Sequence, residues 1–205
     1  MATRFSFNRE RDKEKITIEI LTWDGPFCLP KYETDEIPIK IPDVAGVYLF
    51  CFPYKDGFLL EAAGVTKSTK QRIATHIREY KYGGYNIFDM DAISRLERLE
   101  IWHGWAESKI EENKIEFKNN YEFYSKAIER QLSSYRIFIA TVEDTRKRER
   151  IEAAIMLNSY TSKESWADIA PRWMFLKGRY NHEIPIQIEN KINSPILGLP
   201  SQLEI

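Results

Sequence analysis

The sequence has few of the residues that staple small secreted domains or hold structural metals. Its two cysteines, Cys28 and Cys51, have a spacing that fits neither a disulfide framework nor a zinc motif. No apolar run approaches the length of a membrane span, and residues 1–15 are too polar and charged for a signal peptide. We therefore expect a cytoplasmic protein that has no membrane partner.

The short motifs of several enzyme classes are missing as well. There is no P-loop, no GxGxxG fingerprint, no HExxH zinc motif and no nucleophile elbow. The chain also lacks an excess of positive charge, because its net charge is −1. Residues 65–82 are an exception, since there Lys67, Lys70, Arg72, Arg78 and Lys81 stand against Glu79 alone. Such a local patch can contact phosphates without a basic protein, although a solvated helix face has the same composition.

What is present indicates one folded α+β domain. Hydrophobic residues make up 43% of the 205 residues and aromatic residues 13%, which is enough for a sizeable core. Residues 46–52 and 58–62 predict a β-hairpin, with Asp56-Gly57 at its turn and positive φ at the glycine. A helix follows, capped by Thr66 or Ser68.

The predicted helix has two stripes of side chains. Ile73, Ile77 and Tyr80 share an apolar face through their spacing of four and three residues. Arg72 and His76 lie about 100° round the helix, beside that face. Arginine supplies a planar fork of donors and histidine a proton carrier near neutral pH, so this position suits a phosphate group.

In this order and spacing, these residues resemble the core of the GIY-YIG nuclease family. Gly46-Val47-Tyr48 matches the first motif, and Ala62-Ala63-Gly64 stands where the second is expected. Arg72 follows Gly64 by eight residues, where the family has its catalytic arginine, and His76 comes four residues later. A helix around 149–155 resembles the one that carries the family's metal-binding glutamate, here Glu152.

The resemblance covers 44–82 and 134–160, and it implies a small central antiparallel sheet flanked by helices. It divides the chain into an N-terminal arm or strand (1–44), the core (45–82 and 134–160), an insertion (83–133) and a C-terminal extension (161–205). It further implies that Glu152 holds Mg²⁺ or Mn²⁺, that Arg72 contacts the phosphate, and that His76 assists Tyr48 as a base. Asn158 and Asn181 are both possible counterparts of a family asparagine near the site.

One departure is Ala62, which replaces the tyrosine of the second motif. Lys67, Tyr80 and Tyr82 are candidates to supply the missing polar contact, with Lys67 favoured because it lies beside the helix N-terminus. The predicted substrate-binding residues are Gly64, Thr66, Lys67, Lys70 and Tyr82.

Outside the core, the patterns are more local. Ile16, Ile18 and Ile20 alternate as in a strand with one buried face, and residues 23–26 read as a turn. The apolar positions from Phe117 to Leu132 predict one amphipathic helix, and residues 135–142 predict a central strand. Between its tryptophans, His103 suggests a structural residue in an aromatic cluster.

Two functions are compatible with these observations. The first is a metal-dependent endonuclease acting on DNA, most simply duplex DNA, in a restriction-type role. The alternative is a catalytically degenerate nucleic-acid-binding or protein-interaction domain, which the loss of the second-motif tyrosine favours. The sequence leaves a homodimer open, and it does not separate DNA from RNA as the substrate.

Overall fold

The computed structural model describes residues 17–34, 37, 40–172 and 174–205, and it has a mixed architecture compatible with the α+β class. Its centre is a five-stranded sheet in the order β2-β7-β3-β4-β9. All neighbours in this sheet are antiparallel except β4 and β9, which are parallel. The strands are β2 (Asp24–Phe27), β3 (Gly46–Tyr54), β4 (Gly57–Thr66), β7 (Arg136–Thr141) and β9 (Ile196–Leu197).

The hairpin of β3 and β4 forms where the sequence predicts it, with both strands longer than expected. Its positive φ belongs to Lys55, at 49°, and not to Gly57. Gly57 is required for another reason, because a Cβ there would overlap the backbone carbonyl of Pro195. The tight approach of the 195–197 segment to this turn is a contact between distant parts of the chain, which turn propensity does not reveal.

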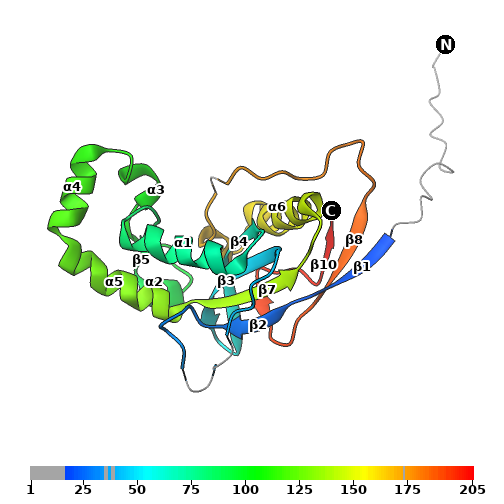
Figure 1. Cartoon of the computed structure of the whole chain (residues 1–205), viewed down its shortest axis with the longest axis horizontal. Coiled ribbons are helices and arrows are strands. Elements are labelled where there is room, and N and C mark those ends of the chain that lie inside the picture. Colours follow the sequence, from blue (N-terminus) through cyan, green and yellow to red (C-terminus); the bar gives the residue numbers. More distant parts are fainter. Residues whose placement is uncertain (1–16, 35–36, 38–39, 173) are drawn as a thin grey trace, which may run out of the picture.

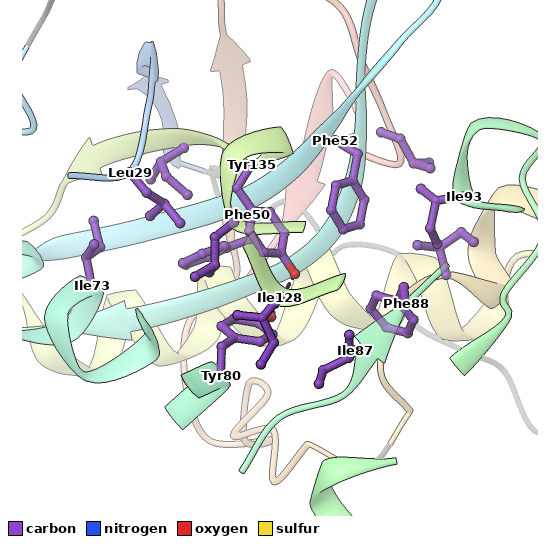
Figure 2. Close-up of a cluster of buried hydrophobic side chains, with 14 of the residues drawn as sticks. Leu29, Phe50, Phe52, Ile73, Tyr80, Ile87, Phe88, Ile93, Ile128 and Tyr135 are labelled. Atoms are coloured by element: carbon purple, nitrogen blue, oxygen red, sulfur yellow. Dashed lines mark hydrogen bonds between the residues drawn. The ribbon is translucent and has the colours of Figure 1, made fainter. Parts of the chain in front are cut away.

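Both faces of the central sheet are covered by helices. On one face, Phe50 and Phe52 of β3 pack with α1 (Thr69–Lys81) and α5 (Tyr121–Ser134), as Figure 2 shows. On the other face, Leu49 and Cys51 pack with α6 (Thr145–Thr161). The predicted central strand β7 lies between β2 and β3 and is buried on both faces, as its uninterrupted apolar run suggested.

A second sheet joins the two ends of the described chain. Strand β1 (Thr17–Thr22) pairs in parallel with β8 (Ile186–Lys191), which pairs with β10 (Gln202–Glu204) (Figure 1). Strand β1 lies where the sequence predicted a strand, but the side chains predicted to be buried are on its exposed face. Ile18 and Ile20 are 61% and 67% exposed, and Leu21 is buried instead. Ile16 lies outside the described residues.

The predicted turn at residues 23–26 is also wrong, because most of it is strand β2. Gly25 takes a φ of 140°, and a Cβ at this position would overlap the Ile137 carbonyl of the neighbouring strand. The Trp-Asp-Gly-Pro composition is therefore explained by close strand pairing and not by a change of chain direction.

The insertion forms a layer of short elements at one end of the sheet (Figure 1). The single long helix predicted there is in fact two helices, α4 (Glu111–Asn119) and α5, with Asn120 between them. Phe117 and Tyr124 still stack on each other across this break, so the apolar spacing reflects a shared core and not a continuous helix. The other elements are β5 (Ile87–Phe88), α2 (Met90–Ser94), β6 (Glu100–Trp102) and α3 (Gly104–Glu107).

After α6, a short 3₁₀ helix, η2 (Ser165–Asp168), begins the C-terminal extension. None of the helices that the structure describes is long and apolar enough to cross a membrane.

Candidate functional site

The site is built on Tyr48 of β3, which lies opposite Gly64 of β4. A Cβ at Gly64 would overlap the Tyr48 hydroxyl and ring, so only glycine leaves room for this side chain to lie across the neighbouring strand. The Tyr48 side chain is buried. Gly64 thus has a structural role in placing the tyrosine, which its assignment as a substrate-binding residue did not include.

Helix α1 brings two polar side chains to the Tyr48 hydroxyl. Arg72 donates a hydrogen bond from Nε to that hydroxyl over 2.9 Å, and His76 Nε2 lies 2.9 Å from it. The helix is held in place by its N-cap Ser68, whose hydroxyl accepts from the Gln71 N–H. Thr66, the other cap candidate, instead bonds through its hydroxyl to the Ser68 backbone and shapes the turn.

Burial determines the protonation of this trio. It lowers the pKa of His76 to about 3, with a further contribution from the Arg72 charge, so the imidazole is neutral at pH 7. It raises the pKa of Tyr48 to about 12, and Arg72 opposes that rise only in part. Tyr48 is therefore protonated, and the arrangement fits a hydroxyl that donates to His76 while it accepts from Arg72.

We expect the buried neutral His76 to make the fold sensitive to acid. Between pH 6.5 and 3 the unfolded chain binds a proton at this residue and the folded chain does not, so folding stability falls as the pH falls. From pH 7 to pH 5 this single group removes about 2 kcal/mol of stability. Denaturant unfolding of wild type and His76→Gln at both pH values measures it, because the difference between the two proteins should shift by that amount in favour of the variant.

The matched control for this experiment is His182→Gln, since His182 is exposed. The pKa values of Glu61 and Glu152 are raised, so these two groups make folding more favourable as the pH falls. Both residues are present in wild type and in each variant, so their effect cancels in the comparison. A His76→Gln variant whose stability difference from wild type is the same at both pH values would contradict a buried neutral imidazole.

Glu152 approaches the same site from α6, on the other side of the sheet. Burial raises its pKa to about 7, and the Arg72 charge opposes this rise in part. Within the described chain it has neither an ion pair nor a hydrogen bond, whereas Glu149, one turn earlier, pairs with Arg146 and Lys177. Glu152 is thus a partly desolvated carboxylate that remains available for a ligand.

Side chains from α1 and α6, on opposite faces of the sheet, reach one cavity beside the edge of β4. Strand β9 pairs only with Phe58 and Leu59, so that within the described part of the chain residues 61–66 have no strand paired on that side. A cavity of about 610 Å³ lies there. Its lining includes Tyr48, Gly64, Arg72, His76 and Glu152, five of the residues that the sequence singled out.

The insertion closes the far end of this cavity. Glu100 forms an ion pair with Arg98 and also bonds to His103 Nδ1, and all three side chains line the cavity. Arg98 further donates to the carbonyl groups of Ile169 and Ala170, which fixes the segment beyond η2. His103 is therefore held by a hydrogen bond to a carboxylate. The flanking tryptophans had suggested that packing in an aromatic cluster would hold it.

Several predicted residues do not reach the cavity. Lys67, Lys70 and Tyr82 are exposed on the outer surface, and Tyr82 is 76% accessible to solvent. Asn158 bonds to the Gly198 carbonyl, and Asn181 is exposed. None of these five is among the residues that line the cavity.

The cavity has polar residues that the sequence did not single out for the site. Tyr85 packs on the His76 ring at 5.1 Å between centroids and lies within electrostatic range of Arg72. Asn86 and Glu61 also line the cavity. Tyr85 belongs to the Tyr-Gly-Gly-Tyr stretch at 82–85, whose composition does not indicate which tyrosine turns inward.

A divalent cation fits the donors that are present. Mg²⁺ is commonly held by one or two carboxylates, several waters and substrate phosphate oxygens, so an unpaired Glu152 satisfies the protein's share. No group of three or more His, Cys, Asp or Glu side chains that could enclose a metal occurs among the described residues. The donor set suits a metal that arrives with its substrate better than one that is permanently caged.

Comparison with known proteins adds no further information, because no family model, curated protein or solved structure matches the chain.

Proposed function

We propose that the chain is a metal-dependent endonuclease with a GIY-YIG-like core, which hydrolyses phosphodiester bonds in DNA in a restriction-type role. The observation that carries the proposal is the convergence of Tyr48, Arg72, His76 and Glu152 on one cavity from β3, α1 and α6. Order and spacing along the chain suggested this set, and the geometry brings the four together from elements that are distant in sequence.

Each residue has a role that its environment supports. Arg72 presents the remaining donors of its guanidinium to a non-bridging phosphate oxygen, while Nε stays on Tyr48. Tyr48 would take a proton from the attacking water through its hydroxyl, and His76, a neutral imidazole whose lowered pKa makes it a weak base, assists by holding that hydroxyl in position. Glu152 would hold the cation, which supplies charge stabilisation and lowers the pKa of bound water.

The competing proposal, a degenerate binding domain, depends on Ala62. The cavity offers a replacement for the missing tyrosine in Tyr85, which is packed on His76 and closer to the site than Lys67 or Tyr82. Tyr80, the third candidate, is already committed, because its hydroxyl bonds to that of Tyr135 over 2.7 Å in the core (Figure 2).

Cleavage of supercoiled plasmid DNA, with and without Mg²⁺ or Mn²⁺, tests the proposal. We expect metal-dependent nicked and linear products, and a parallel incubation with a structured RNA separates the two nucleic acids. Plasmid that stays intact with every divalent metal, while DNA still binds, would establish the binding domain in place of the nuclease.

We expect Tyr85→Phe to lower the cleavage rate about tenfold, which corresponds to one polar contact of about 1.4 kcal/mol in the transition state. The phenyl ring keeps the packing on His76, so the folding stability should stay close to wild type. Tyr82→Phe is the matched control, since that hydroxyl is exposed outside the cavity. If Tyr82→Phe is slow and Tyr85→Phe is not, the replacement has been assigned to the wrong tyrosine.

A further inference from the structure

Strand β4 carries a buried acid that the proposed chemistry does not use. Phe50 pairs with Ala62 and Cys51 pairs with Leu60, so Glu61 is an extra residue in a β-bulge. Leu60, the residue before it, packs in the buried cluster against α6, while Glu61 lines the cavity. Bulges commonly re-aim a side chain next to a functional site.

Glu61 is buried and forms no ion pair among the described residues. It is only 7% exposed. Burial raises its pKa to about 7, although the Arg98 charge and the Tyr135 hydroxyl oppose the rise. A buried carboxyl without a paired charge costs stability, and this cost persists only where the group has another role.

The other cavity acids are accounted for. Glu100 is held by Arg98 and His103, and Asp168 pairs with Arg172 at the surface. Glu152 is assigned to the cation. Asn86 is also committed, since its amide bonds to Glu100 and its oxygen accepts from the Trp105 N–H. Glu61 therefore remains as the acceptor for a ligand in the part of the cavity that surrounds it, which we call the inner part.

The walls of this inner part are aromatic. Phe50 and Phe88 come from the buried cluster in Figure 2, and Tyr85 also contributes to the lining. The Arg98 guanidinium lies over the Phe88 ring at 5.0 Å from its centroid. Flat apolar walls around a single hydrogen-bonding group favour a flat, partly polar ligand.

The distance from Glu61 to Tyr48 and Arg72, where we place the phosphate, suits one nucleotide. Glu61 precedes Gly64 by three residues, which at about 3.3 Å per residue separates them by about 10 Å along β4. Gly64 lies against Tyr48, whose hydroxyl binds Arg72. A phosphate at Arg72 therefore places its own base within reach of Glu61.

We propose that the inner part of the cavity binds an unpaired adenine or cytosine, whose exocyclic amino group donates to Glu61 while the base stacks between the aromatic walls. The proposal rests on the nuclease function in one respect, namely that the base belongs to the nucleotide beside the cleaved phosphate. A carboxyl group matches such bases, since it accepts from an amino group and, when protonated, donates to the adjacent ring nitrogen of adenine or cytosine. Stacking of unpaired bases on aromatic side chains supplies affinity that does not depend on sequence.

The test is equilibrium binding of five-nucleotide single-stranded DNAs, with Ca²⁺ in place of Mg²⁺, whose central position carries adenine, cytosine, thymine or an abasic sugar. We expect wild type to bind the adenine or cytosine oligonucleotide at least tenfold more tightly than the thymine and abasic ones, as one satisfied polar contact predicts. Glu61→Met should reduce that preference to within about twofold and unfold at the same or a higher temperature, because it removes a desolvated acid. Glu164→Met, at an exposed residue, is the control and should keep the preference.

The outcomes separate this proposal from the nuclease function. Plasmid cleavage without any base preference would overturn the nucleobase site and leave the nuclease. A preference that depends on Glu61 without cleavage under any metal would keep the nucleobase site and remove the nuclease. A preference that survives in Glu61→Met, or equal binding of all four oligonucleotides, would also overturn the nucleobase site.

Discussion

Arg72→Ala is expected to lower the rate of plasmid cleavage by on the order of a hundredfold or more, the usual effect of removing a preorganised charge contact from a transition state. The residue lies beside the buried Ile73 and not in the core. Its loss removes one hydrogen bond to Tyr48, so the folding stability should fall by only about 1 kcal/mol. Initial cleavage rates and thermal unfolding of the same preparations measure both effects.

Two further variants make the Arg72 result specific. Arg78→Ala is the matched control, because Arg78 is on the same helix but is exposed, pairs with Glu79 and does not line the cavity. It should cleave at the wild-type rate. Arg72→Lys keeps the charge but loses the planar fork, so it should recover only a small part of the activity. Normal cleavage by Arg72→Ala would remove Arg72 from the reaction, and a variant that fails to fold would count against the assignment because it shows a structural role.

The parts of the fold that the sequence predicts are those with local signals. The β3–β4 hairpin, α1 and α6 follow from strand composition, a turn and helix caps within short windows; in α6 the cap is Asp144, which accepts from the Lys147 N–H. The same windows contain Tyr48, Arg72, His76 and Glu152. The convergence of Tyr48, Arg72 and His76 was predictable because a hairpin followed by a helix restricts where their side chains can lie, whereas Glu152 was placed with them by the resemblance to the family.

Long-range pairing limits the rest of the prediction. Ile18 and Ile20 alternate as a buried face would, yet β1 pairs with β8 more than 160 residues away, and that sheet directs Leu21 inward instead. The turn predicted at 23–26 fails for the same reason, since Asp24 pairs with Ile139 of the distant β7. Alternation specifies that a strand has two faces, but the partner decides which face is buried.

The cavity exposes a similar limit. Side chains from 85–105, 168–172 and 174–175 form much of its wall, and no motif ties these segments to the core. Glu61 is directed inward by a bulge, which depends on register with β3 and not on the residues of β4 alone. The reactive end of the site could therefore be predicted from motifs, whereas the end that selects a ligand required the three-dimensional arrangement.

Glu152→Gln is expected to have the largest effect of all, a loss of roughly a thousandfold in cleavage, equivalent to about 4 kcal/mol of transition-state stabilisation. Glutamine preserves the shape of the side chain but is a much weaker ligand for Mg²⁺ than a carboxylate. The folding stability should stay the same or rise, because the carboxylate at this position is partly desolvated and lacks an ion pair in the described part of the chain. A variant that is more stable and less active indicates a residue kept for function.

Metal titration distinguishes this role from a general disturbance of α6. Calorimetry with Mn²⁺, in the presence of an uncleavable phosphorothioate oligonucleotide, should detect one metal in wild type and none in Glu152→Gln. Glu149→Gln, one turn earlier on the same helix, breaks ion pairs with Arg146 and Lys177 and should still bind the metal. If Glu152→Gln binds Mn²⁺ as well as wild type does, the cation is held elsewhere. Equal loss in both variants would instead assign the effect to the helix and not to the Glu152 carboxylate.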